Sequence, residues 1–154
     1  MVHLHFGIWF KRVTIARTGD AHGHVLHRWP EGIDYGEALS RTAMRAEARR
    51  YIVAAYAGLE AQRLVDDAPR AYHGRDDDQN AFEISCRYQV WGRGGGQVGN
   101  DAHRAYLETL RRESRRLVHH LQREVEAVAG ALLRDKTLTM ADADAIVRRL
   151  RAEP

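Results

Sequence analysis

The chain has 154 residues, of which 44% are hydrophobic and 29% are charged, and this balance excludes wholesale disorder. The length suits one domain with its own hydrophobic core, and the formal net charge is only +3. The single cysteine, Cys86, cannot form an internal disulfide, and the first ten residues lack the long uncharged run of a signal peptide or membrane-spanning helix. We therefore expect a cytoplasmic protein without a membrane anchor.

A small sheet is expected within residues 1–30. Residues 11–16 alternate polar and apolar side chains, and a second run over residues 22–27 follows the turn residues Thr18-Gly-Asp20. Alternation of this kind, interrupted by a turn, predicts a short β-hairpin.

Central helices are expected within residues 35–91. Apolar residues recur at helical spacing from residue 35 to residue 65, and Asp66-Asp-Ala-Pro69 ends that segment. Residues 72–78 are expected to form a loop that leads into a second amphipathic helix over residues 80–91. The fold class that follows is mainly α, a helical bundle with a small amino-terminal sheet.

Residues 92–100 form a glycine-rich loop. Gly94 and Gly99 have the spacing of a phosphate-binding loop, but Asn100 and Asp101 stand where that loop needs a lysine and a hydroxyl residue. We interpret the segment as a linker and expect the chain to bring no ATPase of its own.

Carboxy-terminal helices are expected over residues 101–154. One apolar stripe continues through residues 101–134, which predicts a single long helix. Thr139 and Asp142 have the spacing of a capping box, which predicts a final helix that begins there.

The arginines between Arg104 and Arg123 allow two interpretations. A basic helix face can bind nucleic acid by releasing counterions from phosphates. Glu108 and Glu113 lie among these arginines at spacings that allow ion pairs along a helix, which favours a solvated surface.

Other polar side chains give weaker signals. His22, His24 and His27 cluster on the predicted hairpin, where an exposed rim without a ligand is the simpler interpretation. Ser85 and Cys86 fall within a predicted helix and have no identifiable base nearby in the sequence.

Three stretches, taken in order, resemble the peptidase domain of FtsH-type ATP-dependent zinc proteases. They are residues 11–15 (KRVTI), residues 55–65 (AYAGLEAQRLV), and residues 74–78 (GRDDD) together with residues 84–87 (ISCR). Residues 131–138 (ALLRDKTL) are similar to the family's closing helical element. The order and spacing agree over nearly the whole chain and imply a FtsH peptidase-like fold.

The resemblance implies a partial zinc site. In that family two histidines and a general-base glutamate come from a His-Glu-x-x-His helix, and an aspartate completes the site. Asp78 matches that aspartate, with Gln62 and His73 as candidate neighbours, and nothing matches the two histidines. Residues 1–8 are similar to the second half of the family's metal helix, so we expect the DNA directly upstream to encode His-Glu-x-x-His in frame.

Three functions follow as expectations. The first is a FtsH-type zinc metalloendopeptidase domain that is inactive as given, because the His-Glu-x-x-His motif is absent. Such a chain is not expected to hold zinc stably by itself. Its partners would be a peptide or protein substrate and either a second copy or a separate ATPase. The second is a non-catalytic binding or scaffold module on a peptidase-derived fold. The third, which we favour least, is an arginine-rich helical domain that binds nucleic acid.

Overall fold

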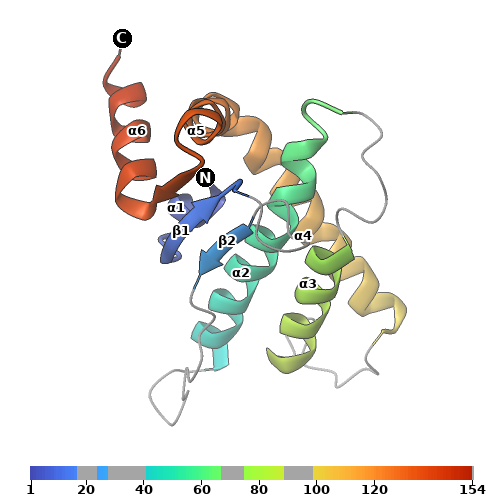
Figure 1. Ribbon diagram of the computed structural model, residues 1–154. Helices are drawn as coiled ribbons and strands as arrows, with labels where there is room; N and C mark the ends of the chain where they lie inside the picture. Colours follow the sequence, from blue (N-terminus) through green and yellow to red (C-terminus); the bar gives the residue numbers. More distant parts are fainter. Residues whose placement is uncertain (17–23, 28–40, 67–74, 89–98, 154) are drawn as a thin grey trace. The chain divides into compact units, whose positions relative to one another are not determined.

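The computed structural model describes residues 1–16, 24–27, 41–66, 75–88 and 99–153 (Figure 1). These residues are mainly helical and include a small antiparallel sheet, as the sequence predicted. Two compact units emerge from the internal contacts, one formed by residues 1–32 with 121–154 and the other by residues 33–120. Each unit is described separately below, and the expectation of a single domain stays a prediction.

The first unit joins the two ends of the chain. Its elements are α1 (Val2–Phe6), β1 (Phe10–Thr14), β2 (His24–His27), α5 (Gln122–Asp135), β3 (Thr137–Thr139) and α6 (Met140–Ala152). Strand β1 lies in the middle of the sheet and pairs antiparallel with both neighbours, Val13 being opposite Val25 of β2 and Leu138 of β3. The predicted hairpin strands are therefore confirmed, whereas its turn lies outside the described residues.

Strand β3 is a correction, because its residues were expected to be part of a helical region. Helix α5 ends where Lys136 adopts a left-handed conformation with φ of 62°, and its amide donates to the carbonyl of Leu132. The left-handed conformation turns the chain at Lys136, so that residues 137–139 run along β1. There Thr14 Oγ1 donates to the Lys136 carbonyl at 3.0 Å. A three-residue strand is too short to show an alternating pattern.

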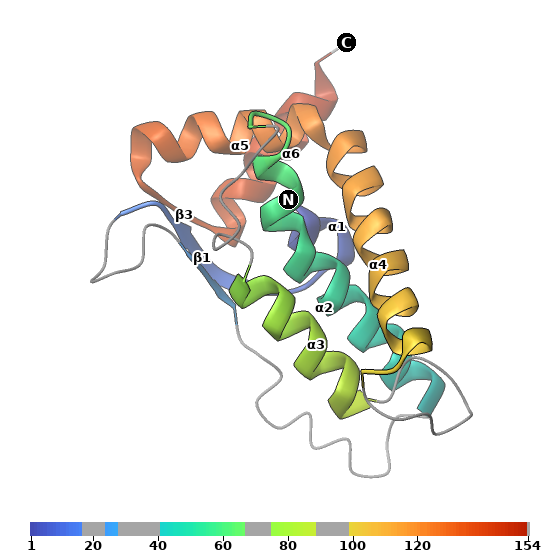
Figure 2. The same cartoon turned by 90° about the vertical axis from the view of Figure 1, so that its right-hand side faces the viewer.

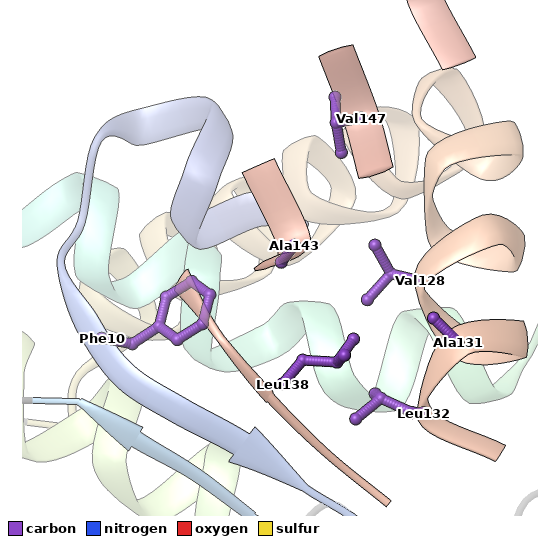
Figure 3. Packing of buried hydrophobic residues seen from close by; sticks show 7 residues of the cluster. All are labelled: Phe10, Val128, Ala131, Leu132, Leu138, Ala143 and Val147. Carbon is purple, nitrogen blue, oxygen red and sulfur yellow. The ribbon is translucent and has the colours of Figure 1, made fainter. Parts of the chain in front are cut away.

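The core of this unit lies between the sheet and its helices (Figure 3). Phe10 of β1 and Leu138 of β3 face apolar side chains from α5 and α6, namely Val128, Ala131, Leu132, Ala143 and Val147. The predicted capping box opens α6: the Thr139 hydroxyl accepts from the Asp142 amide, and the Asp142 carboxylate accepts from the Thr139 amide. This prediction is confirmed.

The single helix predicted over residues 101–134 is wrong. The structure divides it at Leu121, which has φ of −96° and ψ of 18°, into α4 (Asp101–His120) and α5. Neither glycine nor proline stands at the break, and the apolar stripe continues through it because Leu121 is itself buried. Periodicity alone therefore could not reveal the division.

The second unit is a bundle of three helices, α2 (Arg41–Gln62), α3 (Arg75–Tyr88) and α4. Helix α2 packs against both of the others and lies between them in Figure 2. Its buried apolar residues, Ile52 and Val53 among them, form the centre of the bundle. Ser114 of α4 lies so close that its hydroxyl donates to the Val53 carbonyl at 2.9 Å.

Helix α3 begins earlier than predicted. Residues 72–78 were expected to form a loop, but the helix starts at Arg75 and carries Asp76, Asp77 and Asp78 in its first turn. Carboxylates in a first turn are stabilised by the positive end of the helix dipole, which explains the early start. No helix among the described residues is both long and apolar enough to cross a membrane.

Candidate functional site

The carboxylate of Asp78 is the site residue that the sequence singled out. It belongs to the first turn of α3, and its side chain is 51% exposed. Its Oδ1 atom lies 3.5 Å from Nη1 of Arg111 on α4, so the carboxylate faces a guanidinium group. This ion pair connects the start of α3 with the middle of α4.

Arg111 is in turn held by Glu60 of α2. The Glu60 side chain is fully buried, and its Oε1 accepts from Arg111 Nε at 3.1 Å and from Arg63 Nη1 at 2.6 Å. Its Oε2 accepts from Arg115 Nε at 2.7 Å. We call Glu60, Arg63, Arg111 and Arg115 the Glu60 cluster.

The electrostatics of this cluster favour the charged carboxylate. Burial alone would raise the pKa of Glu60, but hydrogen bonds from Arg115 and Arg111 outweigh burial and lower that pKa below its ordinary value. The same contact with Glu60 raises the pKa of Arg115. Glu60 is therefore a buried anion that fixes the position of three cations.

Tyr56 adds an aromatic contact beneath Arg111. The guanidinium carbon of Arg111 lies 5.6 Å from the centre of the Tyr56 ring, a distance typical of a cation–π interaction. Burial, together with the nearby charge of Asp78, raises the pKa of Tyr56 to about 12, so its hydroxyl stays protonated at neutral pH.

Asp77 lies next to the candidate ligand and faces α2. A Cβ atom placed on Gly58 would lie 3.2 Å from the Asp77 carboxylate, so the absence of a side chain at Gly58 allows this close approach. Burial, and then the charges of Asp78 and Asp76, raise the pKa of Asp77 to about 6. Asp77 therefore ionises less readily than an ordinary aspartate.

A buried serine–histidine pair was missed by the sequence reasoning, which found no base for Ser85. Ser85 Oγ lies 2.6 Å from His103 Nε2, and both side chains are fully buried. The Gly99 amide donates to His103 Nδ1 at 3.0 Å, so in the neutral ring Nε2 carries the proton and donates to Ser85. Ser85 in turn donates to the Phe82 carbonyl at 2.7 Å.

The hydrogen bonds of this pair run in the wrong direction for nucleophilic catalysis. A nucleophilic serine must give its proton to the histidine, whereas here the hydroxyl donates to a backbone carbonyl and the ring nitrogen donates to the hydroxyl. Burial lowers the pKa of His103, which agrees with a neutral ring. The contact instead joins α3 to the start of α4. Local sequence patterns could not reveal it, because the two residues are eighteen positions apart.

Gln62, His73 and the hairpin histidines are the other candidate residues that the sequence suggested. Gln62 ends α2, where its carbonyl accepts from the Val65 and Asp66 amides, and His73 lies outside the described residues. His22 also lies outside them, while His24 and His27 are the first and last residues of β2. Within the described ranges, no three His, Cys, Asp or Glu side chains form a group that could hold a metal ion.

Comparison with known protein families and with curated proteins found no match to this chain. The carboxylate of Asp78 is chemically suited to zinc, but the group that it faces is a cation. The described residues thus provide one carboxylate of the expected kind, and they contain no group of three side chains that could hold a metal ion.

Proposed function

We propose that this chain is a peptidase-derived domain of FtsH type, in which Asp78 is a zinc ligand of a site that the described residues do not complete. Its chemistry would be hydrolysis of peptide bonds in a protein or peptide substrate. Zinc, where bound, supplies a polarised carbonyl and an activated water. No catalytic step is assigned to the residues of this chain.

The observation that carries the proposal is the placement of the Asp78 carboxylate. It is half exposed at the start of a helix, and α2, the helix that carries the second matching motif, packs against that helix. Glu60 and Arg111 limit the movement of the carboxylate, since Arg111 is bonded to a buried anion on one side and to Asp78 on the other. A ligand for a metal benefits from such support.

Digestion of casein with added zinc tests the proposal on the chain itself. We expect no cleavage above background, because a single carboxylate cannot hold catalytic zinc. The contrary result is cleavage that a chelator stops and that Asp78→Ala abolishes, while Asp76→Ala does not. It would show that the chain holds a complete zinc site and would contradict the proposal that the site is incomplete.

The ion pair between Asp78 and Arg111 supports a second candidate, a non-catalytic binding module on the same fold. A resident guanidinium neutralises the carboxylate, so a metal ion has to compete with Arg111 for it. Such a module would keep its fold and its surface after addition of a strong chelator, and it would never acquire zinc-dependent activity.

A further inference from the structure

The Glu60 cluster contains more positive charge than its fold requires. One buried carboxylate is surrounded by three guanidinium groups. Even when Asp78 is included, the arginines outnumber the carboxylates. A buried acid is stabilised by one or two such partners, so the cluster has one guanidinium group beyond that number.

Two of the arginines have unused hydrogen-bond donors. Arg63 donates to Glu60 through Nη1 and Arg115 through Nε, whereas a guanidinium group carries five N–H bonds. In the part of the chain that the structure describes, the other N–H groups of Arg63 and Arg115 meet no protein acceptor. Their side chains are 35% and 47% exposed, so an external anion can reach them.

The positions of these donors are fixed from within the bundle. Both arginines are bonded to the same buried carboxylate, which lowers the entropy that they would lose on binding a ligand. A planar guanidinium fork matches the two oxygens of a carboxylate. The arrangement therefore favours an anion that can accept two hydrogen bonds from one guanidinium group.

A nucleic-acid backbone fits less well, because it needs cations along a line. Two of the arginines that would extend the line along α4 are already paired with carboxylates: Arg104 with Asp101 at 2.7 Å and Arg112 with Glu108 at 3.7 Å. Fewer cations are therefore available along this helix than its arginine content suggests.

We propose that Arg63 and Arg115 bind a carboxylate group of a peptide. This goes beyond the proposed function, because it requires neither zinc nor cleavage. The carboxylate is either an acidic side chain or the carboxy terminus of the bound peptide. Both sources present the same chemistry, and the experiment below distinguishes them.

Fluorescence anisotropy with labelled short peptides tests the inference. The first probe carries two glutamates and an amidated end, the second is an uncharged Gly-Ser peptide with a free carboxy terminus, and the third is the amide of the second. We expect the first or the second probe to bind and the third to bind at least about tenfold more weakly. Binding should weaken as salt is added.

Matched variants locate the site. Arg115→Gln should weaken the binding probe about tenfold, whereas Arg104→Gln on the same helix should leave its affinity unchanged. Because Arg115→Gln also removes a partner of Glu60, Arg115→Lys serves as the second variant: it keeps the charge, loses the planar fork and should weaken binding severalfold. Circular dichroism verifies that each variant is folded.

Three results would overturn the inference. They are the absence of binding by both carboxylate probes, an equal loss of affinity in folded Arg104→Gln and Arg115→Lys, and tighter binding of a single-stranded oligothymidine than of either peptide. The last result would favour the nucleic-acid interpretation.

Discussion

Glu60 is the residue on which the bundle of α2, α3 and α4 depends electrostatically. It is fully buried and bonded to arginines 51 and 55 positions away in the sequence, so it connects α2 to α4. Replacing it by glutamine leaves three guanidinium groups without their anion. Since those arginines are partly exposed, we expect Glu60→Gln to lower the free energy of unfolding by about 2–3 kcal/mol, as measured by urea denaturation.

Glu108→Gln is the matched control for that prediction. Glu108 is 55% exposed and pairs with Arg112 on the same helix, so its loss should change the free energy of unfolding by less than about 0.5 kcal/mol. Equal effects of the two substitutions would contradict the role assigned to burial.

Asp77 is predicted to destabilise the native state at neutral pH. Its pKa is about 6 in the fold and 3.8 ordinarily, so between these values the native state holds a proton that the unfolded chain has released. The stability that Asp77 contributes is therefore fully present below about pH 4 and lost as the pH rises through 6. At pH 7 we expect Asp77→Asn to raise the free energy of unfolding by about 1–2 kcal/mol.

Urea denaturation of the wild type and of Asp77→Asn at pH 7 and at pH 4 measures this effect. The gain should disappear at the lower pH, and Asp76→Asn, which removes only the smallest of the three causes of the raised pKa of Asp77, should show a much smaller gain at pH 7. A less stable Asp77→Asn variant at pH 7 would show that the carboxylate is stabilised there, for example by the helix dipole.

At the scale of elements, the start of α6 depends on the reciprocal bonds between Thr139 and Asp142. Thr139→Ala removes the hydroxyl that accepts from the Asp142 amide at 3.2 Å and should cost about 1 kcal/mol of stability. Thermal unfolding measures the change. Thr109→Ala is the control, because that exposed hydroxyl donates to a carbonyl within its own helix, at 2.8 Å. A similar loss of stability in this variant would count against capping as the cause.

Elements with a strong local signal were predictable, and those set by tertiary contacts were not. The hairpin strands followed from alternation, and the capping box followed from the spacing of Thr139 and Asp142. The end of α4 at His120 and the strand of residues 137–139 carry no such signal, because a buried leucine occupies the break and the strand is only three residues long. The strand forms by pairing with β1, near the opposite end of the chain, so local sequence does not reveal it.

At the scale of the whole molecule, the candidate site was predictable only in part. Asp78 was singled out because a motif resemblance pointed to it; its side chain is 51% exposed, and its role as a zinc ligand stays a prediction. Arg111 and Arg115 were interpreted as part of a solvated helix face, with nucleic-acid binding as the alternative, since ion pairs between helices cannot be inferred from spacing along one helix. Local sequence therefore suggested the carboxylate and missed the cluster that supports it.

The central claim is that Asp78 is a zinc ligand of a peptidase-derived site. The most direct test adds a His-Glu-x-x-His helix ahead of Met1, in the register given by the family resemblance, and measures zinc binding by competition with a chromophoric chelator. A fusion whose circular dichroism shows it to be folded should bind one zinc ion, and Asp78→Ala should weaken that binding by at least about tenfold while Asp76→Ala leaves it unchanged. A folded fusion that binds no zinc, or binds it equally well after Asp78→Ala, would contradict the account.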